Sequence, residues 1–253
     1  MRCLLLLLFT TGVWAQTAID RVVSIEHSAG MFASSQPTIT AFWPADRARA
    51  TLIVVQGGEG SMGLTMDSKA VTWATARMVE PLRASMINVV VFDSPYALVD
   101  SCCQWTQARR AEDHITRIAE TVKHYSQLGK PVYLMGHSLG GISVLEYVDR
   151  YPNSVAGLIV SGIQQAPVPT ERVAMPTLVM HHEADTCTVT PWAWSKALAQ
   201  KIGATNPRVE FMSVTGGSNE SRTVTRHGVC TGGHHMYRDS YTQVQSRLIE
   251  FVR

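Results

Sequence analysis

The sequence predicts an α/β fold built on an eight-stranded, mostly parallel sheet with helices on both faces. Apolar and β-branched runs recur along the 253 residues, and segments with helical periodicity separate most of them. The later runs are continuous in Val, Ile and Leu, which is typical of parallel strands buried on both faces. The predicted strands cover residues 21–26, 38–43, 51–55, 88–92, 131–135, 156–161, 177–180 and 208–214.

The first two strands differ from the later ones. They alternate apolar and polar residues and have no helix between them, so we expect an antiparallel pair that leads into the parallel sheet. Only residues 162–175 separate the sixth strand from Pro176, which leaves no room for an inserted domain. The predicted helices cover residues 68–84, 109–128, 142–149, 191–201 and 241–252.

The N-terminus has the pattern of a secretory signal peptide. Arg2 precedes the apolar block 3–9, and the small-residue end Val13-Trp14-Ala15 precedes Gln16. The apolar block is too short to cross a bilayer. We therefore expect residues 1–15 to direct export to the periplasm or the extracellular space, and residues 16–253 to form a single domain with a full core.

Charge and composition argue against several classes of partner. The chain has 22 Lys and Arg against 20 Asp and Glu, spread along its length, so we expect neither a nucleic-acid partner nor stable membrane insertion. The cysteines lack the clustered spacing of a metal site. The glycines at 57, 58 and 60 precede no Gly-Lys-Ser/Thr, which argues against a phosphate loop. The oligomeric state stays open.

The segment Gly136-His137-Ser138-Leu139-Gly140 follows the apolar run 132–135 and precedes a helical pattern. A serine that attacks an acyl carbon must stand clear of its strand, and a strained turn achieves this when small residues flank it on both sides. Ser138 is therefore the candidate nucleophile. The alternative is a serine that caps the following helix.

This order of elements resembles the α/β-hydrolase fold. Within it, four segments look like a group of small secreted bacterial serine hydrolases without a cap domain: Gln56-Gly57-Gly58-Glu59-Gly60, Phe92-Asp93-Ser94-Pro95, the Ser138 turn, and the stretch from His181 to Cys187. The resemblance implies a Ser-His-Asp triad and an oxyanion hole made of backbone N–H groups.

The acid of the triad follows the serine and precedes the histidine in this fold. Asp185 fits, because it follows the strand predicted over 177–180. Glu183 is a weaker substitute. Asp93 precedes Ser138 in the chain and suits a structural turn instead.

The base is expected in the loop Gly232-Gly233-His234-His235 before the last helix. His235 is followed by a methionine and an aromatic residue, as in the group that the chain resembles, and we favour it. His234 is the close alternative, because it directly follows a glycine, as the catalytic histidine commonly does in the superfamily that the chain resembles. We interpret the remaining histidines of these segments, His137, His181 and His182, as packing and hydrogen-bonding groups.

Two backbone N–H groups are expected to bind the oxyanion. The first belongs to Leu139, which follows the nucleophile at a helix N-terminus. The second should come from the loop after the third strand, where glycines allow close approach to a substrate oxygen. We choose Gly58 there, with Glu59 as the alternative.

Export would place the cysteines where disulfides persist, and four cysteines allow three pairings. We expect Cys187 to pair with Cys230, because each lies a few residues from a proposed catalytic residue and the bond would tie the two loops together. For Cys102 and Cys103 two states stay open, a vicinal disulfide or a pair of buried thiols.

Together these features predict a secreted serine hydrolase that acts on a small-molecule or acylated substrate through an acyl-enzyme. A carboxylic ester is the expected bond, and no cofactor or metal is expected. The alternatives are a catalytically inactive binding protein on the same fold, or an acyltransferase.

Overall fold

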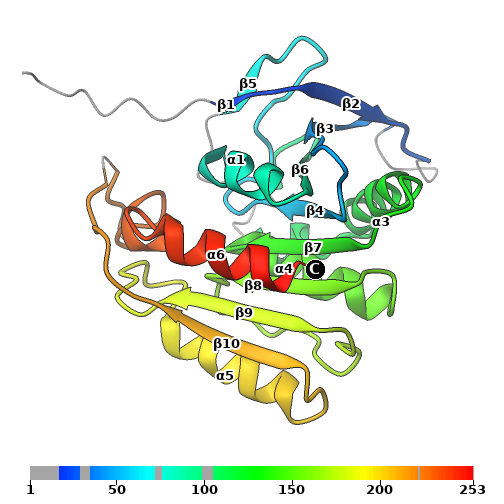
Figure 1. Cartoon of the computed structure of the whole chain (residues 1–253). Coiled ribbons are helices and arrows are strands. Elements are labelled where there is room, and N and C mark those ends of the chain that lie inside the picture. Colours follow the sequence, from blue (N-terminus) through cyan, green and yellow to red (C-terminus); the bar gives the residue numbers. More distant parts are fainter. Residues whose placement is uncertain (1–16, 29–34, 72–75, 99–104, 222, 253) are drawn as a thin grey trace, which may run out of the picture.

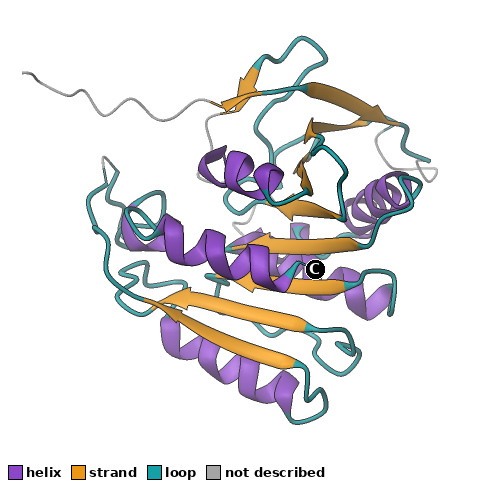
Figure 2. Ribbon diagram, viewed as in Figure 1, coloured by secondary structure: helices purple, strands orange, loops and turns teal. Residues whose placement is uncertain are grey.

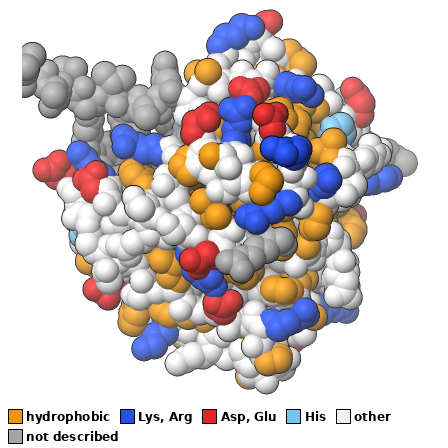
Figure 3. All heavy atoms as spheres, viewed as in Figure 1, with side chains coloured by type: hydrophobic (Ala, Val, Ile, Leu, Met, Phe, Trp, Pro, Cys, Tyr) orange, Lys and Arg blue, Asp and Glu red, His pale blue; other side chains and the backbone are white. Residues whose placement is uncertain are grey.

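The computed structural model describes residues 17–28, 35–71, 76–98, 105–221 and 223–252. A twisted sheet crosses the molecule, with helices packed on its two sides (Figures 1 and 2). The predicted signal peptide and the pair Cys102 and Cys103 lie outside the described residues. On the face seen in Figure 3, acidic and basic side chains are interspersed with apolar ones.

The main sheet has eight strands in the order β10-β9-β8-β7-β4-β6-β3-β2. β3 runs antiparallel to both of its neighbours, and the other pairs are parallel. All eight predicted strands are thus confirmed. Their bounds are β2 Arg21–Ile25, β3 Thr38–Trp43, β4 Ala50–Val55, β6 Ile87–Asp93, β7 Val132–His137, β8 Gly157–Ser161, β9 Thr177–His182 and β10 Val209–Val214.

A two-stranded ribbon corrects the first predicted helix. β1 (Thr17–Ala18) pairs with β5 (Ala70–Val71), and β5 lies inside the range 68–84 that the pattern assigned to a helix. The helix α1 covers only Ala76–Ala84. The pairing with β1, together with the bond from Ile19 N–H to Lys69 O, overrides the local helical preference of this segment.

Other helix boundaries also differ from the prediction. The helix predicted over 109–128 begins later, because residues 109–111 form a turn between a short helix and α3. The helix predicted from 142 begins earlier, at Leu139. A 3₁₀ turn, η1, was not predicted. The remaining bounds are α2 Trp105–Ala108, α3 Glu112–Ser126, α4 Leu139–Arg150, α5 Trp192–Gly203, η1 Gly233–Met236 and α6 Tyr241–Phe251.

The core has two parts, one on each face of the sheet. Buried residues of α3, α4 and α5 pack with Ile53, Val55 and Phe92 on one face, while α1 and α6 pack with Leu52 and Val54 on the other. Residues 162–176, between β8 and β9, form no helix or strand, as expected for a fold without a cap domain. No helix among the described residues is long and apolar enough to span a membrane.

Two glycines allow α4 to begin close to the sheet. A Cβ on Gly140 would lie 2.1 Å from the carbonyl oxygen of Val55, and a Cβ on Gly136 would lie 2.3 Å from the oxygen of Gly140. Both contacts are with backbone atoms, which cannot move aside as a flexible side chain can. The first turn of α4 therefore lies directly against the end of β4.

We expect Gly140→Ala to destabilise the protein by roughly 1–3 kcal/mol or more, the usual cost of an overpacked interior. The reason is that its methyl group would meet the backbone of β4. Gly203→Ala is the matched control, since a Cβ there would lie 3.7 Å from Val209 Cγ1, an ordinary contact. Urea unfolding of the two variants and the wild type measures the difference. Equal stability of the two variants would contradict the close approach of α4 to β4.

Candidate active site

Ser138 lies in the sharp turn between β7 and α4. Its backbone has φ 54° and ψ −122°, a left-handed conformation that costs free energy in a residue with a Cβ and is found at functional sites. The N–H of Ser138 donates to Ser161 O at 2.8 Å, which ties the turn to β8. Ser138 occupies the N-cap position of α4, but its side chain makes no capping hydrogen bond to the helix.

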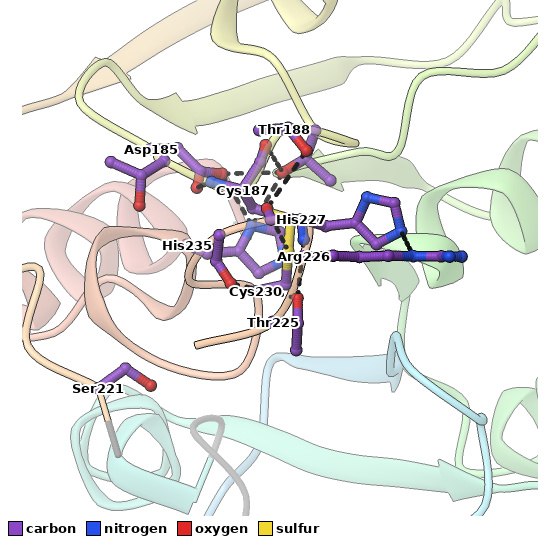
Figure 4. The surroundings of a disulfide bond; sticks show 12 residues. Asp185, Cys187, Thr188, Ser221, Thr225, Arg226, His227, Cys230 and His235 are labelled. Carbon is purple, nitrogen blue, oxygen red and sulfur yellow. Dashed lines mark hydrogen bonds and ion pairs between the residues drawn. A yellow bond between two sulfur atoms is a disulfide. The ribbon is translucent and has the colours of Figure 1, made fainter. Parts of the chain in front are cut away.

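Asp185 and His235 form a buried hydrogen-bonded pair. His235 lies in η1, and its Nδ1 donates to Asp185 Oδ2 at 2.8 Å. The exposed fractions of the two side chains are 1% and 0%. Because an ionised carboxylate only accepts hydrogen bonds, this bond places the proton of a neutral His235 on Nδ1 and leaves Nε2 as a proton acceptor. Figure 4 shows both residues beside the disulfide.

Further donors hold the Asp185 carboxylate. Oδ2 also accepts from His181 Nε2 at 2.9 Å and from Thr190 Oγ1 at 3.0 Å, and Oδ1 accepts from Cys187 N–H at 2.8 Å. Burial by itself would raise the pKa of Asp185, but the hydrogen bonds from His181 and His235 outweigh it and hold the pKa below the ordinary value of 3.8. Asp185 is therefore ionised at neutral pH.

His181 is a partner of the acid that the sequence did not reveal. Because the Asp185 carboxylate only accepts, the His181 nitrogen that faces it, Nε2, carries a proton. With that proton on Nε2, Nδ1 accepts from Ser195 Oγ, on α5, at 2.7 Å. The expectation of a hydrogen-bonding role for His181 is confirmed, and its particular partner is new. The spacing of four residues between His181 and Asp185 was the available signal.

His234 points away from the acid. Its Nδ1 donates to Ala184 O at 2.9 Å, and its ring stacks on that of His182, with centroids 4.1 Å apart and planes 4° apart. His182 in turn donates from Nε2 to Gly216 O at 2.7 Å. Of the two candidate bases, only His235 contacts Asp185.

The structure brings His235 beside the Ser138 turn. The ring of His137, directly before the serine, lies 4.9 Å from the ring of His235. His137 Nδ1 is also hydrogen-bonded to Ser161 Oγ at 3.0 Å, which confirms its packing and hydrogen-bonding role. Among the described residues, no hydrogen bond joins Ser138 Oγ to His235.

The loop after β4 lies against the serine. A Cβ on Gly57 would lie 2.6 Å from Ser138 Cβ and 3.2 Å from Ser138 Oγ, so only glycine fits there. Gly58, the predicted donor, has a left-handed φ of 56°. The other predicted donor, Leu139 N–H, belongs to the first residue of α4, where helical N–H groups lack partners within the helix. Leu139 thus directly follows Ser138, and Gly58 directly follows Gly57, the loop residue that lies against the serine.

Asp93 and Glu183 take no part in this arrangement. The Asp93 carboxylate accepts from Met62 N–H at 2.5 Å and from Leu64 N–H at 2.7 Å, so its predicted structural role is confirmed. Burial raises the pKa of Asp93 to about 6, although these two bonds oppose the shift. Glu183 is exposed. No group of three or more His, Cys, Asp or Glu side chains in the described part of the chain could hold a metal ion.

The predicted disulfide between Cys187 and Cys230 is confirmed. It joins the loop of Asp185 to the segment that precedes η1 and His235 (Figure 4). Backbone bonds reinforce the connection, because Thr188 N–H donates to His227 O at 2.8 Å. The loops that carry Asp185 and His235 are therefore linked covalently.

Part of the chain is similar to a known family and to one curated protein. The model of the family described as serine aminopeptidase, S33, matches residues 104–166, a range that includes Ser138. Phospholipase YtpA of Bacillus subtilis (strain 168) is 26% identical over 120 residues, which cover 47% of this chain and 42% of that protein. The match thus spans less than half of either protein.

Similar solved structures cover nearly the whole chain. Est1E from Butyrivibrio proteoclasticus has a TM-score of 0.59 at 12% identity, covering 91% of this chain and 97% of that one. XC6422 from Xanthomonas campestris, an α/β serine hydrolase without lid, has a TM-score of 0.59 at 15% identity, covering 92% and 93%. A thermophilic esterase from Thermogutta terrifontis has a TM-score of 0.58 at 15% identity, covering 92% and 98%.

The solved structures define the fold. The chain has the fold of α/β serine hydrolases. The segment 104–166, which contains Ser138, is in addition similar to the S33 serine aminopeptidase family.

We expect the double variant Cys187→Ser/Cys230→Ser to lose roughly 2–4 kcal/mol of stability, as is usual for a native bridge that closes a loop of this size. The bridged residues are separated by 43 positions. Urea unfolding of the variant measures the loss, and reduction of the wild type should produce the same shift. An unfolding midpoint that responds to neither change would contradict the bond.

The lowered pKa of Asp185 predicts a pH-dependent stability. The folded-state pKa of Asp185 lies below the ordinary value of 3.8. As the pH falls, the unfolded chain therefore binds a proton at Asp185 before the folded protein does. The stabilisation is present above the unfolded pKa and is lost as the pH falls through the folded one. Urea unfolding between pH 7 and pH 3 should show the deficit of Asp185→Asn relative to wild type shrinking on acidification, and a constant deficit would contradict this linkage.

Proposed function

We propose that this protein is a serine hydrolase that cleaves carboxylic esters through an acyl-enzyme. The observation that carries the proposal is the buried Asp185–His235 hydrogen bond beside a serine in a left-handed turn. A nucleophile, a base and an orienting acid are the three groups that acyl transfer requires. All three lie at one end of the sheet.

In the proposed mechanism, His235 Nε2 takes the proton of Ser138 Oγ as that oxygen bonds to the ester carbon. The carbonyl π electrons move to oxygen, and the N–H groups of Leu139 and of Gly58 or Glu59 stabilise the resulting anion. The imidazolium then gives its proton to the leaving alkoxide, which departs as the alcohol. Water attacks the acyl-enzyme by the same route, releases the acid and restores Ser138. Asp185 remains ionised throughout and stabilises the imidazolium.

The names of the relatives support an ester as the bond that is cleaved. The curated relative YtpA is called a phospholipase. Of the solved structures, the one from Thermogutta terrifontis is called an esterase, and another is named Est1E. The absence of helices and strands from residues 162–176 favours a site bordered by short loops. We also propose that residues 1–15 are removed on export and that residues 16–253 act as one domain. The disulfide supports this localisation, because such bonds persist in oxidising compartments.

The decisive experiment is the intact mass of the purified protein before and after treatment with a fluorophosphonate, with Ser138→Ala in parallel. We expect one adduct on the wild type and none on the variant. With p-nitrophenyl esters of increasing acyl length, Ser138→Ala should lower kcat by about 10⁴-fold or more. A folded wild-type protein that gains no adduct and hydrolyses no ester would overturn the proposal.

The adjacent histidines offer a matched pair of variants. His235→Ala should lower kcat by about 10³-fold or more, because it removes the base. His234→Ala should leave kcat within about 10-fold of wild type, since the side chain of His234 bonds to Ala184 O and not to the acid. Steady-state kinetics on one ester measures both. Equal losses in the two variants would show that the base lies elsewhere.

A further inference from the structure

The loop after β4 is held by a buried arginine that the mechanism above does not use. Arg109 lies in the turn between α2 and α3, with none of its surface exposed. Its Nη1 donates to Gln56 O at 2.8 Å, and its Nη2 donates to Gly57 O at 3.0 Å and to Gly58 O at 2.8 Å. One guanidinium thus binds three successive carbonyl groups.

These bonds determine where the N–H groups of the loop point. In a planar trans peptide, the N–H of each residue points away from the carbonyl oxygen of the residue before it. With the carbonyls of residues 56–58 turned toward Arg109, the N–H groups of Gly57, Gly58 and Glu59 are turned away from it. Successive N–H groups presented on one side of a chain form a concave site for an anion.

The anion in question is the one that forms on Ser138. Gly57 is in contact with that serine, since its Cβ would lie 3.2 Å from Ser138 Oγ. We propose that Arg109 is a positioning residue that holds the peptide planes of residues 56–58 so that their N–H side stabilises the oxyanion. The inference rests on the proposed function of Ser138.

An arginine suits this task better than a lysine. Its planar fork carries five N–H donors in fixed directions, whereas the lysine ammonium is a compact charge at the end of a flexible stem. The loop also closes tightly on the guanidinium, because a Cβ on Gly60 would lie 2.9 Å from Arg109 Nη2. Burial lowers the pKa of Arg109 to about 9, which leaves it protonated at neutral pH.

The test compares Arg109→Lys with Arg117→Lys. Arg117, in α3, is also fully buried. It donates to a backbone carbonyl, Gln36 O at 2.7 Å, and it also bonds to Asp113 and Thr38. It therefore controls for the loss of a buried arginine away from the loop. For each variant we would measure kcat and KM with a p-nitrophenyl ester, the Ki of an alkyl boronic acid that forms a tetrahedral adduct on the serine, and urea unfolding.

We expect Arg109→Lys to lower kcat by about 10- to 10³-fold, a loss comparable to that of an oxyanion donor, with KM within about 3-fold of wild type. The Ki of the boronic acid should rise by a similar factor, because an oxygen of the adduct occupies the oxyanion hole. Arg117→Lys should lower stability while kcat and Ki stay near wild type. Arg109→Gln, which keeps two N–H donors, serves as a second variant and should also lose kcat.

Three results would overturn the inference. The first is an Arg109→Lys protein with wild-type kcat and Ki. The second is an equal loss of kcat in the Arg109 and Arg117 variants. The third is failure of both Arg109 variants to fold while Arg117→Lys folds, which would assign Arg109 to the fold. A wild-type protein without esterase activity or fluorophosphonate labelling would instead reject the proposed function, so the two failures are distinguishable.

Discussion

The contact between the first turn of α4 and the end of β4 is the constraint on which the site depends. Gly140 has no Cβ, and its backbone can therefore approach the carbonyl oxygen of Val55. This approach sets the depth of α4, and with it the position of Ser138 at the start of the helix. The chain leaving β4 then passes next to the serine, where Gly57 must also lack a side chain. The candidate nucleophile and the candidate oxyanion loop are thus placed by one backbone contact.

A second dependence runs through the Asp185 carboxylate. The carboxylate accepts hydrogen bonds from β9, from its own loop and from η1. The sheet and the disulfide bring these three segments together. A buried carboxylate is costly unless it is fully hydrogen-bonded, and here both oxygens have partners. The same bonds that offset the burial of the charge also orient His235. Structural and chemical roles therefore coincide in a single side chain.

The sequence predicted the sheet and the serine turn well, and the reasons are local. Strand runs such as 51–55 and 88–92 are uninterrupted apolar stretches, and the residues of the Ser138 turn carry their own steric requirement for glycine. The helix predicted over 68–84 was wrong because of a contact between distant segments, since β5 pairs with β1. The narrow choice of His235 over His234 also depends on such a contact, because only the structure shows which ring reaches Asp185. The bonds of Arg109 to residues 56–58 join positions about fifty apart, and no periodicity reveals them.

The two buried charges at the site differ in how they are compensated. Asp185 is surrounded by donors from side chains and the backbone, whereas Arg109 is bonded to backbone carbonyl groups. Its Nε has no hydrogen-bond partner among the residues that the structure describes. A buried group with an unmade bond costs free energy that an apolar residue of similar shape would avoid. Stability alone therefore does not explain a guanidinium at this position. Its geometry does, because three successive carbonyl groups that face one way require a fork of donors, and the N–H groups on the opposite side are then available to the substrate.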